Sequence, residues 1–347
     1  MKTNRRQFIK ACAAALALPL VFVTSPTSAE MVRREILVSV IGLNRPSYAP
    51  VAESVPKVIG YWIKAMDREI GNKPDLVVLP ECCDTVPTKT PEEKAAWIRL
   101  RGTKPLEAFQ AYAARHGCYL VYATHRERED GRFANSSILI DRQGRVAATY
   151  DKVFPTVGES ACEACQIVPG TKAVVAETDF GRLGFAICFD LNFHELLDEY
   201  AEKAPDVIAF SSFFDGDFLQ RDWACRCGSY IVSSTCASWL EKRVVDPSGT
   251  ELRHENYYQP TFTARVNTNY RVLHLDFNRV KFPAIIAKYG RRVSIRNPGS
   301  VGIVTLLSND PELPVDQIVK EFQLETYREY LARSREARVK ALRAKVD

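Results

Sequence analysis

The sequence predicts an α/β fold, because strand-like and helix-like segments alternate along most of the chain and their apolar residues follow two different periods. Short apolar runs at 36–43 and 76–79 predict buried strands, whereas apolar residues three and four apart between 55 and 70 predict an amphipathic helix. The composition, with 46% hydrophobic and 26% charged residues, excludes a disordered or collagen-like chain. A chain of 347 residues can bury a large core.

The remaining elements follow in regular order. Residues 91–116 are expected to form one or two helices, followed by a strand at 118–123. Two apolar stretches, 136–140 and 146–150, flank Asp-Arg-Gln-Gly and predict a hairpin. The later expected elements are strands at 183–188, 207–210 and 230–233, a helix at 195–202, and short strands on either side of a turn at 246–249. Together they predict one α/β domain of about 280 residues.

Residues 1–29 have the features of a bacterial export signal. Arg5 and Arg6 precede an apolar run at 11–23, and small residues follow up to Ala29. The paired arginines resemble the twin-arginine type of signal. Since the apolar run is shorter than the ~20 residues that span a bilayer, we expect cleavage after Ala29, no stable membrane anchor, and a periplasmic or extracellular protein.

The charge balance gives no reason to expect a nucleic-acid partner. The first 29 residues carry four of the 47 basic residues and no acidic one, which leaves 43 basic against 42 acidic residues. Nine of the ten cysteines lie after the signal, and in an oxidising compartment an odd number leaves at least one thiol unpaired.

The last part of the chain, 311–347, differs in character from the rest. After Pro314 the sequence leads into a segment rich in Arg, Glu and Ala, which predicts a charged C-terminal helical extension. Such a helix is either a solvated terminus or an arm that packs on a second subunit, and the sequence barely separates these two interpretations.

Three predicted strands are each followed closely by a reactive side chain: Glu81, Lys152 and Cys188. Ligand crevices form at the carboxyl ends of strands in α/β sheets. A thiol with an ordinary pKa of about 8.5 is only about 3% ionised at pH 7, so a nucleophilic Cys188 needs a base or a cation nearby. None of the five histidines is a natural base here, whereas Glu81 can accept the proton and Lys152 can stabilise an oxyanion.

These motifs resemble the Glu-Lys-Cys triad of the carbon–nitrogen hydrolase (nitrilase) superfamily. Glu81 stands in Leu-Pro-Glu, Lys152 in Tyr-Asp-Lys, and Cys188 in Ile-Cys-Phe-Asp. Further matches are Asn135 before a strand, Glu159 in Pro-Thr-Val-Gly-Glu, Phe193-His194-Glu195, Trp223 with Arg226, and the turn Asp246-Pro247-Ser248-Gly249. The resemblance covers roughly 34–280, and we therefore expect a carbon–nitrogen hydrolase domain at 30–310 with an αββα sandwich fold.

The resemblance also implies a reaction: hydrolysis of a small amide to an acid and ammonia or an amine through a thioester on Cys188. Glu81 is the implied base, Glu159 a supporting carboxylate, and Lys152 with the backbone N–H of Phe189 the oxyanion hole. The resemblance implies no cofactor and no metal. It does imply a homodimer or a higher homo-oligomer. Cys-Phe-Asp favours an amidase over a nitrilase, which typically carries Cys-Trp-Glu. A nitrilase and a soluble acyltransferase on the same fold remain alternatives.

Two further hypotheses belong to other classes of protein. His125, Glu127, Cys162 and Cys165 approximate a zinc deaminase pattern, although Ala161 stands where proline is expected. A disulfide or two incidental thiols is the simpler interpretation of Cys162 and Cys165. An exported binding protein without catalysis is the other hypothesis. For the substrate pocket we expect the loops 211–219 and 280–298. Three arginines of the second loop either hold a carboxylate or are simply solvated: Arg291, Arg292 and Arg296.

Overall fold

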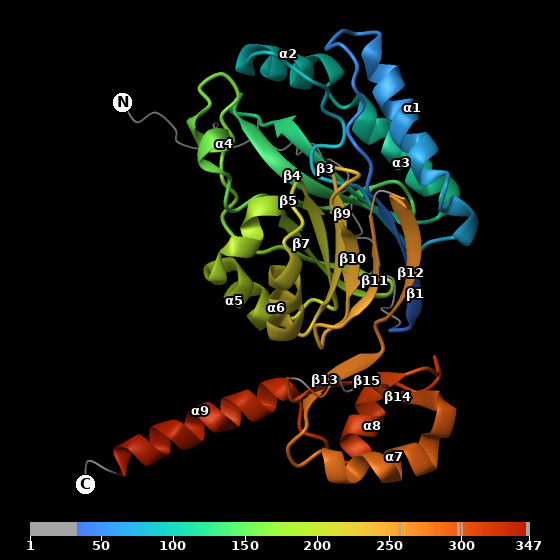
Figure 1. Cartoon of the computed structure of the whole chain (residues 1–347), viewed down its shortest axis with the longest axis vertical. Helices are drawn as coiled ribbons and strands as arrows, with labels where there is room; N and C mark the ends of the chain where they lie inside the picture. Colours follow the sequence, from blue (N-terminus) through green and yellow to red (C-terminus); the bar gives the residue numbers. More distant parts are fainter. Residues whose placement is uncertain (1–32, 257, 297–298, 300, 345–347) are drawn as a thin grey trace, which may run out of the picture.

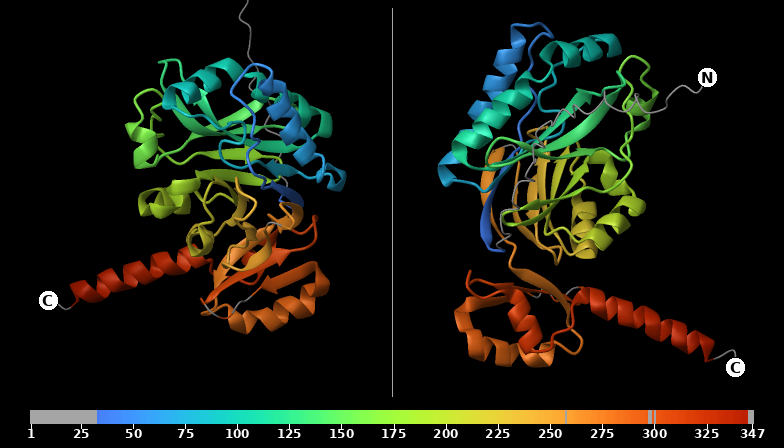
Figure 2. Two further views of the ribbon diagram at one scale, coloured as in Figure 1. Left: turned by 45° about the horizontal axis from the view of Figure 1, so that its top comes forward. Right: turned by 180° about the vertical axis from the view of Figure 1, so that it is seen from behind.

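The computed structural model describes residues 33–256, 258–296, 299 and 301–344 (Figure 1). The predicted export signal, 1–29, lies outside the described residues. Two six-stranded sheets stack face to face with helices on their outer sides, so the expected α/β class with an αββα sandwich is confirmed (Figure 2). Within the described residues, no helix is both long and apolar enough to cross a membrane.

The first sheet has the strand order β12-β1-β2-β3-β4-β5. Its strands are β1 (Glu35–Ile41), β2 (Leu76–Val78), β3 (Tyr119–Glu127), β4 (Phe133–Ile140), β5 (Val146–Asp151) and β12 (Thr261–Asn267). The strands β1, β2 and β3 are parallel, whereas β4 pairs antiparallel with both β3 and β5. As a result β2, β3 and β5 run in one direction, and their carboxyl ends share one edge of the sheet.

The second sheet has the order β11-β10-β9-β8-β7-β6. Its strands are β6 (Val175–Thr178), β7 (Gly181–Ile187), β8 (Val207–Ser212), β9 (Tyr230–Thr235), β10 (Lys242–Val245) and β11 (Glu251–Glu255). The central strands β7, β8 and β9 are parallel. Because both faces of these strands are covered, their apolar residues run without a break instead of alternating with polar ones.

Alternating side chains of the strands divide the core into layers. In β1, Ile36, Val38 and Val40 face the second sheet, and Phe185 of β7 lies in the same apolar cluster. The outer face of the first sheet packs on α1 (Ser54–Met66) and α3 (Lys104–His116), and that of the second on α5 (His194–Lys203) and α6 (Asp217–Cys227). Two shorter helices, α2 (Pro91–Arg101) and α4 (Val157–Ala161), lie near the edge where β2, β3 and β5 end.

The chain after β12 forms a smaller unit with its own core. A three-stranded sheet, in the order β13-β15-β14, packs on α7 and α8. The elements are β13 (Tyr270–His274), α7 (Phe282–Tyr289), β14 (Val293–Arg296), β15 (Ile303–Ser308), α8 (Val315–Glu321) and α9 (Tyr327–Arg343). The sequence-based boundary at residue 310 falls between β15 and α8, which contribute to the same apolar cluster, and the small sheet already begins at Tyr270.

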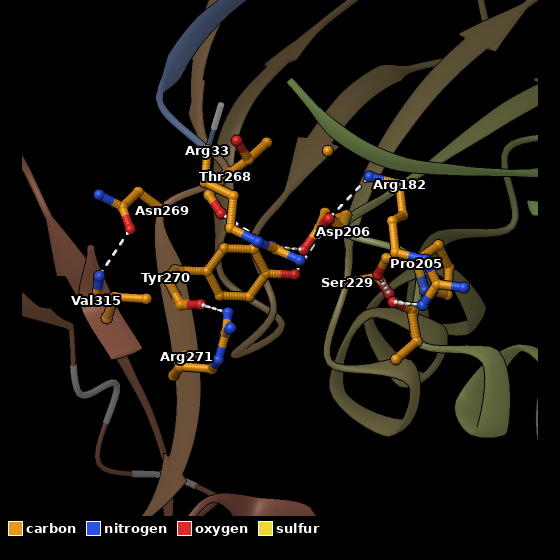
Figure 3. A network of polar contacts seen from close by, with 12 residues as sticks. Arg33, Arg182, Pro205, Asp206, Ser229, Thr268, Asn269, Tyr270, Arg271 and Val315 are labelled. Atoms are coloured by element: carbon orange, nitrogen blue, oxygen red, sulfur yellow. Dashed lines mark hydrogen bonds and ion pairs between the residues drawn. The ribbon is translucent and has the colours of Figure 1, made fainter. Parts of the chain in front are cut away.

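The small unit joins the sandwich through buried polar contacts (Figure 3). The Tyr270 hydroxyl lies 3.1 Å from the carbonyl oxygen of Asp206 and 2.7 Å from that of Gly228, and within the sandwich Arg33 pairs with the carboxylate of the same Asp206. Asn269 accepts the backbone N–H of Val315 at 2.9 Å and so fixes the start of α8. In contrast, α9 has no buried residue and projects away from the sandwich in Figures 1 and 2.

Candidate active site

The three reactive side chains singled out from the sequence line one cavity of about 300 Å³. Glu81 follows β2 and Lys152 follows β5 in the first sheet, while Cys188 follows β7 in the second sheet. Glu81 Oε1 lies 3.2 Å from Lys152 Nζ, and Cys188 is a free thiol that is only partly buried. The fold therefore brings together three groups from distant parts of the chain, with Glu81 and Cys188 more than a hundred positions apart.

Lys152 lies between two carboxylates. Its ammonium is 2.8 Å from Glu159 Oε2, in addition to the contact with Glu81. Asn135 Nδ2 donates to Glu81 Oε1 at 2.7 Å and to Glu159 Oε1 at 3.0 Å, so one amide connects both acids. The backbone N–H of Phe213 donates to the other oxygen of Glu81 at 3.1 Å. These contacts fix the position of the Glu81 carboxylate, which is only 3% exposed.

The charges of this network stabilise one another. Burial alone would lower the pKa of Lys152, but the carboxylates of Glu81 and Glu159 outweigh it and raise that pKa. Burial alone would raise the pKa of Glu159, but hydrogen bonds from His125 and Lys152 outweigh it and lower that pKa. At neutral pH, Lys152 is therefore a cation and Glu159 an anion.

Cys188 occupies a strained turn directly after β7. Its φ is 47°, in the left-handed region that side chains with a Cβ rarely adopt, and a 3-10 turn follows over Cys188–Asn192. The buried Asp190 carboxylate braces this turn by accepting the backbone N–H groups of Ile187 and Phe154, each at 2.9 Å, and the Tyr150 hydroxyl at 2.7 Å. Phe189, whose N–H was expected in the oxyanion hole, belongs to the same turn.

The Cys188 thiol is neutral in the free site. Burial and the nearby Glu81 carboxylate raise its pKa to about 12, although Lys152 acts in the opposite direction. Only on the order of one thiol in 10⁵ is then ionised at pH 7. A nucleophilic Cys188 must consequently transfer its proton to a neighbouring base as it reacts.

Neither Cys82 nor His125 was assigned to the hydrolase site from the sequence, and both line the cavity. His125 follows the strand predicted at 118–123, but β3 continues past it, and the side chain is buried, with Nε2 3.3 Å from Cys82 Sγ and 3.9 Å from Glu159 Oε1. Burial lowers the pKa of His125 to about 4, so the ring is neutral. The pairing of β3 with β4 would have placed His125 in the site, because His125 is the cross-strand partner of Asn135, which contacts both Glu81 and Glu159.

The zinc deaminase hypothesis is not supported by the structure. Cys162 and Cys165 form a disulfide with each other, so neither sulfur is a thiolate ligand. Glu127 lies at the end of β3, where its carboxylate pairs with Arg99 at 2.8 Å. Across the described ranges, no group of three or more His, Cys, Asp or Glu side chains could hold a metal ion.

The prediction that both loops line the substrate pocket is wrong for one of them. Of the two loops, the first supplies Phe213 to the cavity, but 280–298 forms α7 and β14 of the small unit instead. Arg292 pairs there with Asp310 at 2.6 Å, and Arg296 lies 3.7 Å from Asp246. The cations that do line the cavity, besides Lys152, are Arg45 and Lys94, from the loop after β1 and from α2.

Comparisons with known proteins agree with this fold. The sequence pattern of the family described as "Carbon-nitrogen hydrolase" matches residues 37–250. A curated relative is the deaminated glutathione amidase of Homo sapiens, which is 28% identical over an alignment of 222 residues that covers 56% of this chain and 67% of that protein.

Solved structures are similar in fold at lower identity. A Saccharomyces cerevisiae protein of branch 10 of the nitrilase superfamily has a TM-score of 0.57 and 19% identity, over 76% of this chain and 100% of its own. A cysteine-to-alanine mutant of an amidase from Nesterenkonia sp. AN1, in complex with butyramide, has a TM-score of 0.58 and 15% identity, over 77% of this chain and 99% of its own.

Proposed function

Since the chain belongs to the carbon–nitrogen hydrolase family, we propose that this amidase-like hydrolase cleaves small amides to an acid and ammonia or an amine, with Cys188 as the nucleophile. The observation that carries the proposal is the shared cavity of Glu81, Lys152 and Cys188, in which the carboxylate and the ammonium are 3.2 Å apart. A base, a cation and a thiol in one cavity are the groups that acyl transfer through a thioester requires.

In the first step Glu81 accepts the proton of the Cys188 thiol, and the sulfur attacks the amide carbonyl carbon. The carbonyl oxygen becomes an oxyanion, which Lys152 and the N–H of Phe189 stabilise. The pKa of about 12 makes this coupling necessary, because a free thiolate would be too rare at neutral pH. Asn135 and the Phe213 N–H hold Glu81 in place for the transfer.

In the second step the tetrahedral intermediate collapses. The carbon–nitrogen bond breaks, protonated Glu81 gives its proton to the leaving nitrogen, and a thioester remains on Cys188. Water then attacks the thioester carbonyl while Glu81 accepts a proton from it. The second tetrahedral intermediate releases the acid, and the sulfur is reprotonated, so the enzyme returns to its starting state.

An assay of ammonia release from a panel of small amides, carbamoyl compounds and nitriles tests the proposal. Cys188→Ala is expected to abolish release and to leave the unfolding midpoint close to that of the wild type, because the side chain is only partly buried. Cys225→Ala, which removes a free thiol on α6 outside the cavity, is the matched control and should retain activity. More than a few per cent of activity in Cys188→Ala would refute the nucleophile assignment.

The amide, rather than the nitrile, is supported by the Cys-Phe-Asp motif and by the amidases among the relatives. The intermediate is a second test, because an acyl adduct on Cys188 has a mass set by the substrate. Rapid quenching and mass spectrometry of the peptide should find it. Release of the acyl group only after an amine is added would instead indicate acyl transfer. An inert Cys188 towards thiol reagents would favour a binding protein without catalysis.

We further propose that residues 1–29 direct export of the folded protein, and that the enzyme acts in the periplasm or outside the cell. The paired arginines and the short apolar run support this proposal. Replacement of Arg5 and Arg6 by lysine is expected to retain the full-length precursor in the cytoplasm. Cell fractionation measures the result, and unchanged export of the double variant would contradict the twin-arginine route.

A further inference from the structure

We propose that a cavity between the sandwich and the small unit is a second binding site, which takes a small molecule with a phosphate group and an apolar body. The site lies outside the catalytic cavity, and the inference does not depend on the proposed amide hydrolysis. The cavity has a volume of about 300 Å³, like that of the catalytic cavity. Its lining contains five arginines: Arg33, Arg182, Arg226, Arg271 and Arg328.

The arginines reach this cavity from both parts of the molecule. In the sandwich, Arg182 lies at the start of β7 and Arg226 near the end of α6, whereas Arg271 lies in β13 of the small unit and Arg328 in the first turn of α9. Figure 3 shows Arg182 and Arg271 at this junction together with Tyr270. The cationic lining is therefore a product of the way in which the two parts pack, and not of a single charged helix.

Asp206 is the one acid among the lining residues that the structure describes. Its carboxylate is already engaged, because one oxygen pairs with Arg33 and the other accepts the backbone N–H of Arg182 at 2.8 Å. Asp206 therefore neutralises Arg33. The other four guanidinium groups have no acid inside the cavity to neutralise them.

Three of these four arginines pair with acids outside the lining. The pairs are Arg182 with Glu177, Arg226 with Asp198 and, at 3.8 Å, with Asp222, and Arg271 with Asp316. The side chains of Glu177, Asp198 and Asp316 are 60–65% exposed, and pairs with such exposed partners contribute little to stability. A guanidinium has five N–H donors, so each arginine can keep its outer acid and bind an inner phosphate at the same time.

Arg328 has no acid partner in the part of the chain that the structure describes. Its guanidinium donates to backbone carbonyl oxygens at the ends of two helices, those of Ala201 and Glu202 in α5 and that of Cys227 in α6. Partial burial and the nearby Arg182 lower the pKa of Arg328. An anion in the cavity acts in the opposite direction, because it favours the charged guanidinium.

The lining indicates the chemical class of the ligand. A phosphate monoester carries a charge of about −1.5 to −2 at pH 7 and three acceptor oxygens, so it can bind several guanidinium groups at once. A carboxylate offers a single charge and two oxygens. The rest of the lining is partly apolar and includes Pro205, Val272 and Tyr327. We therefore expect an apolar or aromatic group beside the phosphate, in a molecule small enough for about 300 Å³.

Isothermal titration calorimetry of the full chain with three probes tests the inference. Phenyl phosphate should bind at pH 7.5 with one molecule per chain and at least about 10-fold more tightly than inorganic phosphate, because its ring covers the apolar part of the lining. Phenol, which lacks the phosphate, should show no saturable binding. The affinity for phenyl phosphate should fall in 0.5 M NaCl. Binding of phenol as tight as that of phenyl phosphate, or no binding of phenyl phosphate, would overturn the site. Equal affinities for phenyl phosphate and inorganic phosphate would overturn the proposed ligand class.

Charge-removing variants locate the ligand. Arg271→Gln and Arg328→Gln should each raise the Kd of phenyl phosphate about 10-fold or more, the effect of one lost charge-assisted hydrogen bond. Arg271→Lys keeps the charge without the planar fork and should give an intermediate Kd; it also serves as the test if the loss of Arg328 unfolds α9. Arg338→Gln, at an exposed arginine of α9, is the matched control and should leave the Kd within about twofold.

Two more variants separate this site from the catalytic cavity. Arg45→Gln removes a cation that lines the catalytic cavity and should not change the Kd of phenyl phosphate. A Kd that rises in Arg45→Gln but not in Arg271→Gln would place the anion in the catalytic cavity and overturn the inference. Cys188→Ala should bind phenyl phosphate as the wild type does. Because calorimetry measures binding alone, a protein that releases ammonia from no amide would still decide this inference.

Discussion

Replacement of Lys152 by methionine should leave the buried Glu81 carboxylate and the partly buried Glu159 carboxylate close together without a counter-ion. Asn135 Nδ2 is 2.7 Å from one oxygen of Glu81 and 3.0 Å from one of Glu159, so these two oxygens are at most about 5.7 Å apart. At an effective dielectric constant of about 20, two unit charges at this separation repel by about 3 kcal/mol, or about two pKa units. One of the two acids should therefore stay protonated to a higher pH than an isolated carboxyl group does.

The sign of the pH dependence follows from this shift. A carboxyl group with a folded-state pKa above its unfolded value of about 4.3 loses stability as the pH rises through the folded value. The stability of Lys152→Met relative to wild type should therefore fall by a further ~2 kcal/mol between pH 5 and pH 8. In the wild type, the lowered pKa of Glu159 gives the opposite pH dependence. The stability that this carboxylate contributes is present above its unfolded-state pKa and is lost as the pH falls toward the folded-state pKa.

Urea unfolding of both proteins at pH 5 and pH 8 measures this difference. Lys57→Met, at an exposed position on α1, is the control for a lysine lost at the surface and should show no such trend. Activity is a separate readout, and the loss of one oxyanion donor should lower kcat by 10²–10³-fold. An equal stability difference at the two pH values would refute the coupling of Glu81 and Glu159 through Lys152.

Three further predictions concern the supports of the site and the assembly. Asp190→Asn should destabilise the protein by about 1–3 kcal/mol in urea unfolding and lower kcat, because three donors lose their carboxylate; unchanged kcat would contradict its role at the turn. The double variant Cys162→Ser/Cys165→Ser, with its four-residue loop opened, should lose about 2 kcal/mol in the same assay; an unchanged midpoint would contradict a stabilising bond. We propose that the chain forms a homodimer through α9, so removal of Tyr327–Arg343 should halve the mass in light scattering; an intact monomer in the full-length protein would exclude this.

The positions of Glu81 and Cys188 could be placed at strand ends from the sequence, because each follows a short apolar run that has few alternatives to a buried strand. Lys152 could be placed by the turn of the predicted hairpin, since the strand before it, β5, is mostly exposed. Their meeting in one cavity needed more than periodicity. It depends on two sheets that stack with their strand ends together. Local propensity does not predict how the sheets stack, and this arrangement was expected only from the resemblance of several ordered motifs to a known family.

The elements that sequence patterns missed have a physical reason in common. The predicted strand at 118–123 ended before His125, because polar side chains at 124–127 interrupt the apolar run although the backbone ladder with β4 continues to Glu127. The segment 280–298 contains the apolar residues of α7 and β14, but their partners lie at 303–324, and only the tertiary fold reveals that they form a separate core. Arg45 lies outside the regular elements, where no period signals its position.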